Sequence, residues 1–417
     1  MHRLSRRAII ITAIAATVAL AAGVLAAFLI KAEAESGYNE AAAELTSAVQ
    51  QLNAAGTALD AARTGAVEKV TDTRSLTAEI DPALLADAAT IAALQGPLTA
   101  LITAAELTEA DSTLTAPLAT PALPAPDMSS APKTSLEEAE AALRAQTATV
   151  IADTAALTAT TTAITTATTD VDAARAALAA SAYAYGSATT PRSKASADTV
   201  SAYTAAVAAL AAPAVDADLT ALLVAYRTAW YATLTSDAIA RAGTGAEEPT
   251  YMRGILVVNK TFAIPSTFGN GLTAETSANF AAMQAAASAA GHKISITSGF
   301  RSFASQTSIY NRYVSNEGVE GADTHSARPG HSEHQSGLAF DLNSITQSFG
   351  ATPAGIWVAE NAHLYGFVVR YPQGKEEITG YIWEPWHLRY VGVEIATTLY
   401  TSGLTIEEYL GVDSVYR

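Results

Sequence analysis

The 417-residue sequence predicts an α+β C-terminal domain, preceded by an N-terminal transmembrane helix and a mostly α-helical, coiled-coil-like stalk. Three observations lead to this fold class. Residues 8–30 carry no charge, an apolar residue recurs every seven positions between residues 143 and 178, and residues 250–417 hold 21 of the 29 aromatic residues. Because aromatic side chains supply much of the buried area of a core, the compact domain is expected at the C-terminal end.

Composition excludes several classes of function. The chain carries 24 Lys+Arg against 40 Asp+Glu, so its net charge of −16 would repel a phosphate backbone, and no nucleic-acid partner is expected. It has no cysteine, which excludes disulfides, a thiolate nucleophile and Cys-ligated metal sites. Any metal must therefore be held by histidine and carboxylate.

The apolar stretch Ala8 to Ile30 follows Arg3, Arg6 and Arg7. At about 1.5 Å per residue it is long enough to span a bilayer core of about 30 Å. The positive flank predicts a single-pass anchor in the cell membrane with everything after Lys31 outside. The alternative is a cleaved signal peptide, since Ala32-Glu33-Ala34 fits a cleavage pattern, and the chain would then be secreted.

The rest of the chain is divided by composition. We expect five segments: an anchor or signal (1–31), an Ala/Thr-rich helical region (32–115), a Pro-rich linker (116–133), a helical stalk (134–245) and a compact domain (246–417). The linker contains five prolines, which rule out a continuous helix.

Two periodic patterns predict the long helices. Apolar or small residues follow four-three spacing, interrupted by Arg63, at Leu45, Val49, Leu52, Gly56, Leu59, Ala66 and Val70. A second set recurs every seven residues, as in a coiled-coil-like hairpin: Leu143, Val150, Leu157, Ile164, Val171 and Leu178. A third helical stretch, about 195–241, is interrupted at Pro213. These helices are interpreted as a stalk that lifts the C-terminal domain off the membrane. The alternative is a docking surface, for which the sequence identifies no partner.

In the C-terminal domain, short strands alternate with helices, which indicates an α+β fold. We expect strands at 255–258 and 294–297, helices at 274–290 and 305–314, and a Gly/His-rich loop at 318–332.

The densest polar chemistry lies between His331 and Asp341. In a strand, Leu338, Phe340 and Leu342 would face the core while Gly337, Ala339 and Asp341 face the other way. A His and an Asp beside one cleft suit a zinc site with nitrogen and oxygen ligands. The third ligand is expected within residues 384–387, where Glu384 is well placed to act as a general base.

Four segments, SGFRSFASQ, RPGHSEHQSGLAFDL, LYGFVVRYPQGKEEITGY and EPWHLRYVG, resemble the VanY-type zinc D-alanyl-D-alanine carboxypeptidases, whose fold is shared with the hedgehog signalling domain. The resemblance covers about 254–392. It implies a Zn²⁺ ion held by His334, Asp341 and His387, with Glu384 as catalytic base. It assigns Arg301 to substrate binding and charge stabilisation, and further implies that Gln306, Ser332 and Tyr371 line the substrate pocket. Trp386, which can wall the site off from water, is expected among the substrate-binding residues from its place in the segment 384–387.

The implied activity is removal of the C-terminal D-alanine from peptidoglycan stem peptides outside the membrane, in cell-wall maturation or glycopeptide resistance. Two alternatives stay open: an L,D-carboxypeptidase that acts on stem tetrapeptides, and a non-catalytic wall-binding scaffold. Glu333, Glu376 and Glu377 are interpreted as solvated charges outside the site.

Overall fold

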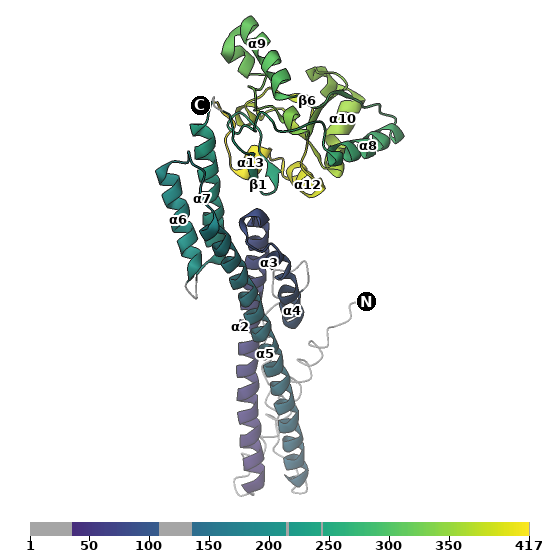
Figure 1. The fold of residues 1–417 in the computed structure, drawn as a ribbon. Helices are drawn as coiled ribbons and strands as arrows, with labels where there is room; N and C mark the ends of the chain where they lie inside the picture. Colours follow the sequence, from purple (N-terminus) through teal and green to yellow (C-terminus); the bar gives the residue numbers. More distant parts are fainter. Residues whose placement is uncertain (1–35, 108–135, 214–216, 243–244, 417) are drawn as a thin grey trace. The chain divides into compact units, whose positions relative to one another are not determined.

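The computed structural model describes residues 36–107, 136–213, 217–242 and 245–416 (Figure 1). The chain divides into two compact units. Unit 1 comprises Met1–Ala78 and Ala89–Leu178, and unit 2 comprises Glu79–Ala88 and Ala179–Arg417. The predicted linker at 116–133 lies outside the described residues.

Unit 1 is built from helices. They are α2 (Ser36–Glu79), α3 (Ala89–Ala92), α4 (Gln95–Ala105) and α5 (Leu136–Ala188), of which α2 and α5 continue into unit 2. The seven-residue repeat lies on α5, as predicted. In its first part, Leu143 and Val150 are buried against Leu45 and Leu52 of α2.

Farther along α5, a third helix joins the two helices of the predicted seam. Ile164 and Val171 of α5 pack in one cluster with Leu59 of α2 and with Leu98 and Leu101 of α4. The small side chains of α2 and α5 in this region leave space that the leucines of α4 fill. A spacing pattern within one helix cannot reveal how many partners cover its apolar stripe.

The predicted fold class needs a correction at its transmembrane helix. Among the residues that the structure describes, none of the helices combines the length and the apolar character needed to cross a bilayer. The longest ones, α2 and α5, are rich in threonine and interrupted by charged residues. The fold described here therefore contains no transmembrane helix, and the stretch Ala8 to Ile30, for which one was predicted, lies outside the described residues.

Unit 2 begins with a helical part. Its elements are η1 (Pro82–Leu84), the end of α5, α6 (Ala197–Ala211) and α7 (Leu219–Ala240). The break predicted at Pro213 is confirmed, since α6 ends before it and α7 begins after Asp218, whose carboxylate accepts a hydrogen bond from the Ala221 amide. Tyr203 of α6 packs on Trp230 of α7, with ring centroids 5.1 Å apart.

The rest of unit 2 is an α+β domain, as predicted. Its strands are β1 (Tyr251–Met252), β2 (Ile255–Leu256), β3 (Ile296–Ser298), β4 (Ala339–Leu342), β5 (Phe367–Tyr371) and β6 (Glu384–Tyr390). β1 and β2 form a hairpin, and the other four form an antiparallel sheet in the order β3-β4-β6-β5.

Several helices of this domain begin after a Ser or Thr residue that caps the helix. They are α8 (Ala274–Ala289), α9 (Phe303–Asp323), α10 (Pro353–Asn361), α11 (Glu376–Thr379), α12 (Val393–Ser402) and α13 (Ile406–Leu410), with 3₁₀ turns η3 (Glu333–Ser336), η4 (Gln347–Ala351) and η5 (Ala362–Tyr365) (Figure 1). The side chains of Thr273, Ser302 and Thr352 cap α8, α9 and α10 by accepting a backbone N–H. The loop predicted from Gly318 begins later, because α9 resumes after a kink at that residue.

The core lies between the four-stranded sheet and helices α8 and α10. Phe340 of β4 is fully buried and makes edge-to-face contacts with Phe280 of α8 and Phe367 of β5, at 5.0 and 5.2 Å between ring centroids. The predicted alternation holds for Phe340 and Leu342, which both lie in this core. Leu338 packs instead on a separate cluster with Leu256.

Replacing Phe340 by Ala should lower the free energy of unfolding by about 3–5 kcal/mol, because it removes the ring on which two other rings pack and leaves a cavity. Urea unfolding followed by tryptophan fluorescence measures the change. The matched control is Leu364→Ala, since that side chain is exposed. An equal loss in both variants would contradict this assignment of the core.

Candidate active site

Two strands and one turn bring the three predicted metal ligands together. Asp341 on β4 and His387 on β6 are directly paired across the strands, so their side chains emerge on the same face. His334 comes from η3, just before β4. One donor atom from each residue lies within 4.8 Å of the others, and all three residues are buried.

A glycine makes this approach possible. Gly337 ends η3 with φ 73°, a left-handed conformation that costs glycine little. A Cβ at this position would lie 2.2 Å from the Gly271 carbonyl oxygen. The chain can therefore turn sharply from His334 into β4 only because residue 337 has no side chain.

Each of the two histidines has one ring nitrogen facing Asp341 and the other facing an acceptor, the Gly299 carbonyl for His334 and the Glu333 carboxylate for His387. His334 Nδ1 lies 2.7 Å from the Gly299 carbonyl oxygen, which can only accept, so Nδ1 carries the proton and Nε2 faces Asp341 Oδ2 at 3.2 Å. His387 Nδ1 lies 3.1 Å from Asp341 Oδ1. Two imidazole nitrogens and a carboxylate that converge in a buried pocket fit the donor set of zinc.

Burial and hydrogen bonds set the protonation of the ligands. Burial lowers the pKa of His334. For Asp341, burial favours the neutral acid, but the neighbouring imidazoles of His334 and His387 outweigh it and hold the pKa far below its usual range. Burial also opposes the charge of His387, yet its hydrogen bonds to Asp341 and Glu333 raise its pKa to about 9. The pocket therefore stabilises a cation beside Asp341.

Glu384 begins β6 next to the ligand cluster. Its Oε2 lies 3.8 Å from His387 Nδ1, and its side chain is 11% exposed. Burial is the main cause that raises the pKa of Glu384 to about 7. A carboxylate with a pKa near neutrality can both take and return a proton, which suits a general acid and base.

Arg301 follows β3 and lies near Asp341. Its Nη2 is 3.9 Å from Asp341 Oδ2 and donates to Ser298 Oγ, and its Nη1 donates to Gln306 Oε1 at 3.0 Å. Burial lowers the pKa of Arg301. The guanidinium is thus held by two neutral acceptors rather than by a close carboxylate, so much of its charge stays available.

Three of the four other predicted pocket residues lie around the same cluster, and the fourth, Gln306, does not. A cavity of about 380 Å³ is lined by Arg301, His334, Asp341, Glu384, His387, Ser332, Tyr371 and Trp386, among others. Tyr371 packs beside His387, with ring centroids 5.0 Å apart. Trp386 also belongs to the apolar core. Gln306 is buried behind Arg301 and donates to the Ala327 carbonyl, so it supports the guanidinium rather than lining the cavity.

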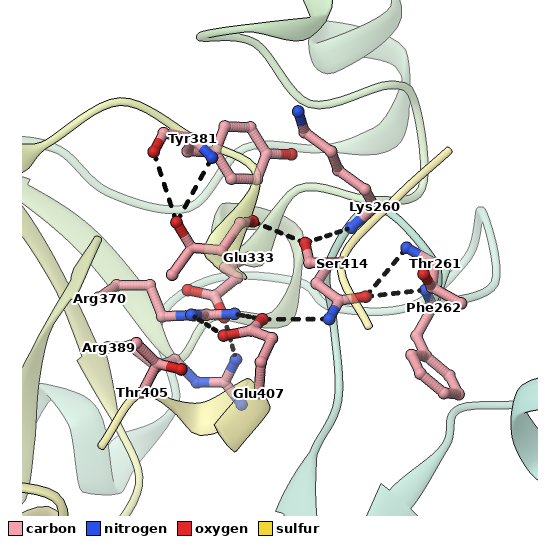
Figure 2. Close-up of polar contacts among 12 residues, drawn as sticks. Lys260, Thr261, Phe262, Glu333, Arg370, Tyr381, Arg389, Thr405, Glu407 and Ser414 are labelled. Atoms are coloured by element: carbon pink, nitrogen blue, oxygen red, sulfur yellow. Dashed lines mark hydrogen bonds and ion pairs between the residues drawn. The ribbon is translucent and has the colours of Figure 1, made fainter. Parts of the chain in front are cut away.

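The interpretation of Glu333 as a solvated charge is wrong, because its side chain is 1% exposed. Figure 2 shows Glu333 together with Arg370, Arg389 and Glu407 in a buried ion network. Burial opposes the charge of Glu333, but Arg370 and Arg389 outweigh it and hold its pKa far below the usual range. No local pattern revealed this, because both arginines come from distant strands.

Known proteins are similar to this part of the chain. Residues 269–393 match the family model described as VanY: D-alanyl-D-alanine carboxypeptidase. The protein YodJ of Bacillus subtilis (strain 168), which is named as a putative carboxypeptidase, is 45% identical over 130 residues, which are 30% of this chain and 48% of that protein. The chain thus spans about half the length of the curated relatives it matches.

Two solved structures are also similar. The LdcB LD-carboxypeptidase is 33% identical and matches 40% of this chain and 94% of its own, with a TM-score of 0.37. A mutant of the D,D-pentapeptidase VanY from a VanB-type resistance cassette, in complex with Zn(II), is 35% identical and matches 37% of this chain and 97% of its own, with a TM-score of 0.34.

Proposed function

We propose that this VanY-type domain is a zinc-dependent carboxypeptidase, and that it removes the C-terminal D-alanine from peptidoglycan stem peptides outside the membrane. The observation that carries the proposal is the buried group of His334, Asp341 and His387 with Glu384 beside it. A binding module has no need of a base with a raised pKa next to three converging ligands. The catalytic group therefore favours an enzyme over a scaffold.

His334, Asp341 and His387 would hold the zinc ion. When bound, zinc supplies a Lewis acid that polarises the scissile carbonyl and lowers the pKa of water. Glu384 takes the proton from the attacking water and returns it to the nitrogen of the departing D-alanine. Because Glu384 is buried, bulk water does not compete for that proton.

Arg301 has two tasks in this proposal. Its guanidinium can neutralise the charge that develops on the scissile carbonyl oxygen, and it attracts the anionic end of the substrate to the cavity. Gln306 and Ser298 hold the guanidinium in place through its two Nη atoms. Tyr371 and Trp386 supply rigid walls against which the terminal residues of the peptide can pack.

Stem peptides of two lengths test the function directly. The purified protein is incubated with a pentapeptide that ends in D-Ala-D-Ala and with a tetrapeptide that ends in a single D-alanine, and D-alanine release is measured by mass spectrometry. The proposal expects release from the pentapeptide. Release from the tetrapeptide alone would favour the L,D alternative, and release from neither would contradict the proposal.

Replacing Arg301 by Lys should lower the rate of D-alanine release by about 10²–10³, the usual cost of losing one donor to a developing oxyanion. A lysine keeps the charge but cannot reach Ser298 and Gln306 with two nitrogen atoms. Steady-state kinetics should show the loss mainly in kcat. The control is Arg312→Lys, an exposed arginine that lines the same cavity. A normal kcat in the Arg301 variant would exclude this role.

A further inference from the structure

The two carboxylate oxygens of Glu333 contact different groups. Oε1 accepts hydrogen bonds from Arg370 Nε and Arg389 Nη1, both at 2.7 Å. Oε2 faces His387 Nε2 at 3.3 Å. Since both guanidiniums bind Oε1, Oε2 is left for the imidazole.

This contact determines which nitrogen of His387 can bind a metal. An ionised carboxylate can only accept, so Nε2 must carry the proton that it donates to Glu333. When the ring is neutral, as it must be to bind a metal, its lone pair lies on Nδ1, which faces Asp341. A carboxylate behind a histidine ligand fixes the tautomer and the orientation of the ring.

Glu333 is itself held rigidly by buried groups. Arg389 also donates to the Leu256 carbonyl oxygen at 2.6 Å, and Arg370 donates to Glu407 Oε2 of α13 at 2.8 Å. Glu407 in turn accepts a hydrogen bond from Asn259 Nδ2. The two carboxylates, of Glu333 and Glu407, thus balance the charge of the two guanidiniums. Through these contacts, Glu333 is held against β6 and α13, which are distant from it in the sequence.

We propose that Glu333 is a positioning residue of the metal centre, which presents Nδ1 of His387 to the metal by accepting the Nε2 proton. The inference rests on the metal site of the proposed function. It goes further in assigning a role to a residue that is neither one of the three metal ligands nor the base. Metal affinity and the protonation of His387 can both be measured without substrate, so a failure of this proposal is distinguishable from a failure of the proposed activity.

Glu333→Gln tests the proposal most directly, because it keeps the size of the side chain and changes only one carboxylate oxygen to an amide group. Arg370 and Arg389 hold the amide oxygen, so the amide NH₂ group faces His387 Nε2 and no acceptor remains for the Nε2 proton. Zn²⁺ affinity of the metal-stripped full chain, measured by competition with a chromophoric chelator, should fall by about 10–100-fold, as is usual when such a support is lost. Circular dichroism verifies that the variant is folded.

Glu407→Gln is the matched control. It removes one carboxylate from the same buried network but has no contact with His387, so Zn²⁺ affinity should stay near that of the unmodified protein while stability falls. Equal loss of affinity in both variants would assign Glu333 a merely structural role. Unchanged affinity in Glu333→Gln would overturn the proposal as well.

A measurement on the unmodified protein covers the case in which Glu333→Gln does not fold. In the zinc-loaded full chain, ¹⁵N NMR of the imidazole should show a protonated Nε2 and a metal-bound Nδ1 at His387. The Nε2 proton should exchange slowly with water, because it is buried and hydrogen-bonded. A metal bound through Nε2 would refute the assignment without any variant.

Discussion

Replacing Glu384 by Gln is expected to lower the rate of D-alanine release from a stem pentapeptide by about 10²–10⁴, the usual contribution of a general acid and base. Glutamine fills the same space beside His387 but cannot accept the proton of the attacking water. The three metal ligands are left in place, so bound zinc should not change. Peptide kinetics and metal analysis on the same sample measure both quantities.

Glu377→Gln is the matched control for this loss, because Glu377 is exposed on α11. It should retain both full activity and bound zinc. If Glu384→Gln keeps its rate, Glu384 is not the base. If it loses zinc along with activity, Glu384 contributes to metal binding instead.

Removing the metal is expected to reduce D-alanine release to background, and adding Zn²⁺ back should restore it. Without the ion, the three donors hold no Lewis acid that can polarise the scissile carbonyl. The melting temperature should fall too, since a ligand present at about 1,000 times its dissociation constant stabilises the folded state by about 4.1 kcal/mol. Dialysis against a chelator, followed by activity and melting measurements, tests both effects.

Two variants distinguish a site-specific loss from a general one. His387→Ala should mimic metal removal even with zinc present. His363→Ala should keep zinc and activity, since His363 stacks on Tyr400 of α12, with ring centroids 3.8 Å apart, and does not line the cavity. Full activity in the metal-free protein would refute metal-assisted hydrolysis.

The sequence predicted much of the local structure. The seven-residue repeat of α5, the break at Pro213 and the inward face of β4 at Phe340 follow from periodicity and proline chemistry, which act over a few residues. The predicted metal ligands lie in two short segments with distinctive composition. The structure brings His334, Asp341 and His387 within reach of one another through the pairing of β4 and β6.

Other features depend on contacts between distant segments. The third helix beside α5 was missed because an apolar stripe does not reveal how many partners cover it. The transmembrane helix of the predicted fold class is not among the described helices. The kinked extension of α9 past Gly318 was missed because glycine is usually a signal that a helix has ended.

By itself, the sequence determined the acidic charge, the absence of thiol chemistry and the short motifs that carry the candidate chemistry. Only the tertiary structure decided the burial and the pKa of the groups in the site. Glu333 is an ordinary charged residue in the sequence, but two arginines from β5 and β6 surround it when the strands pair. Burial likewise sets the pKa of Glu384, because desolvation depends on every segment packed around a group and not on its sequence neighbours.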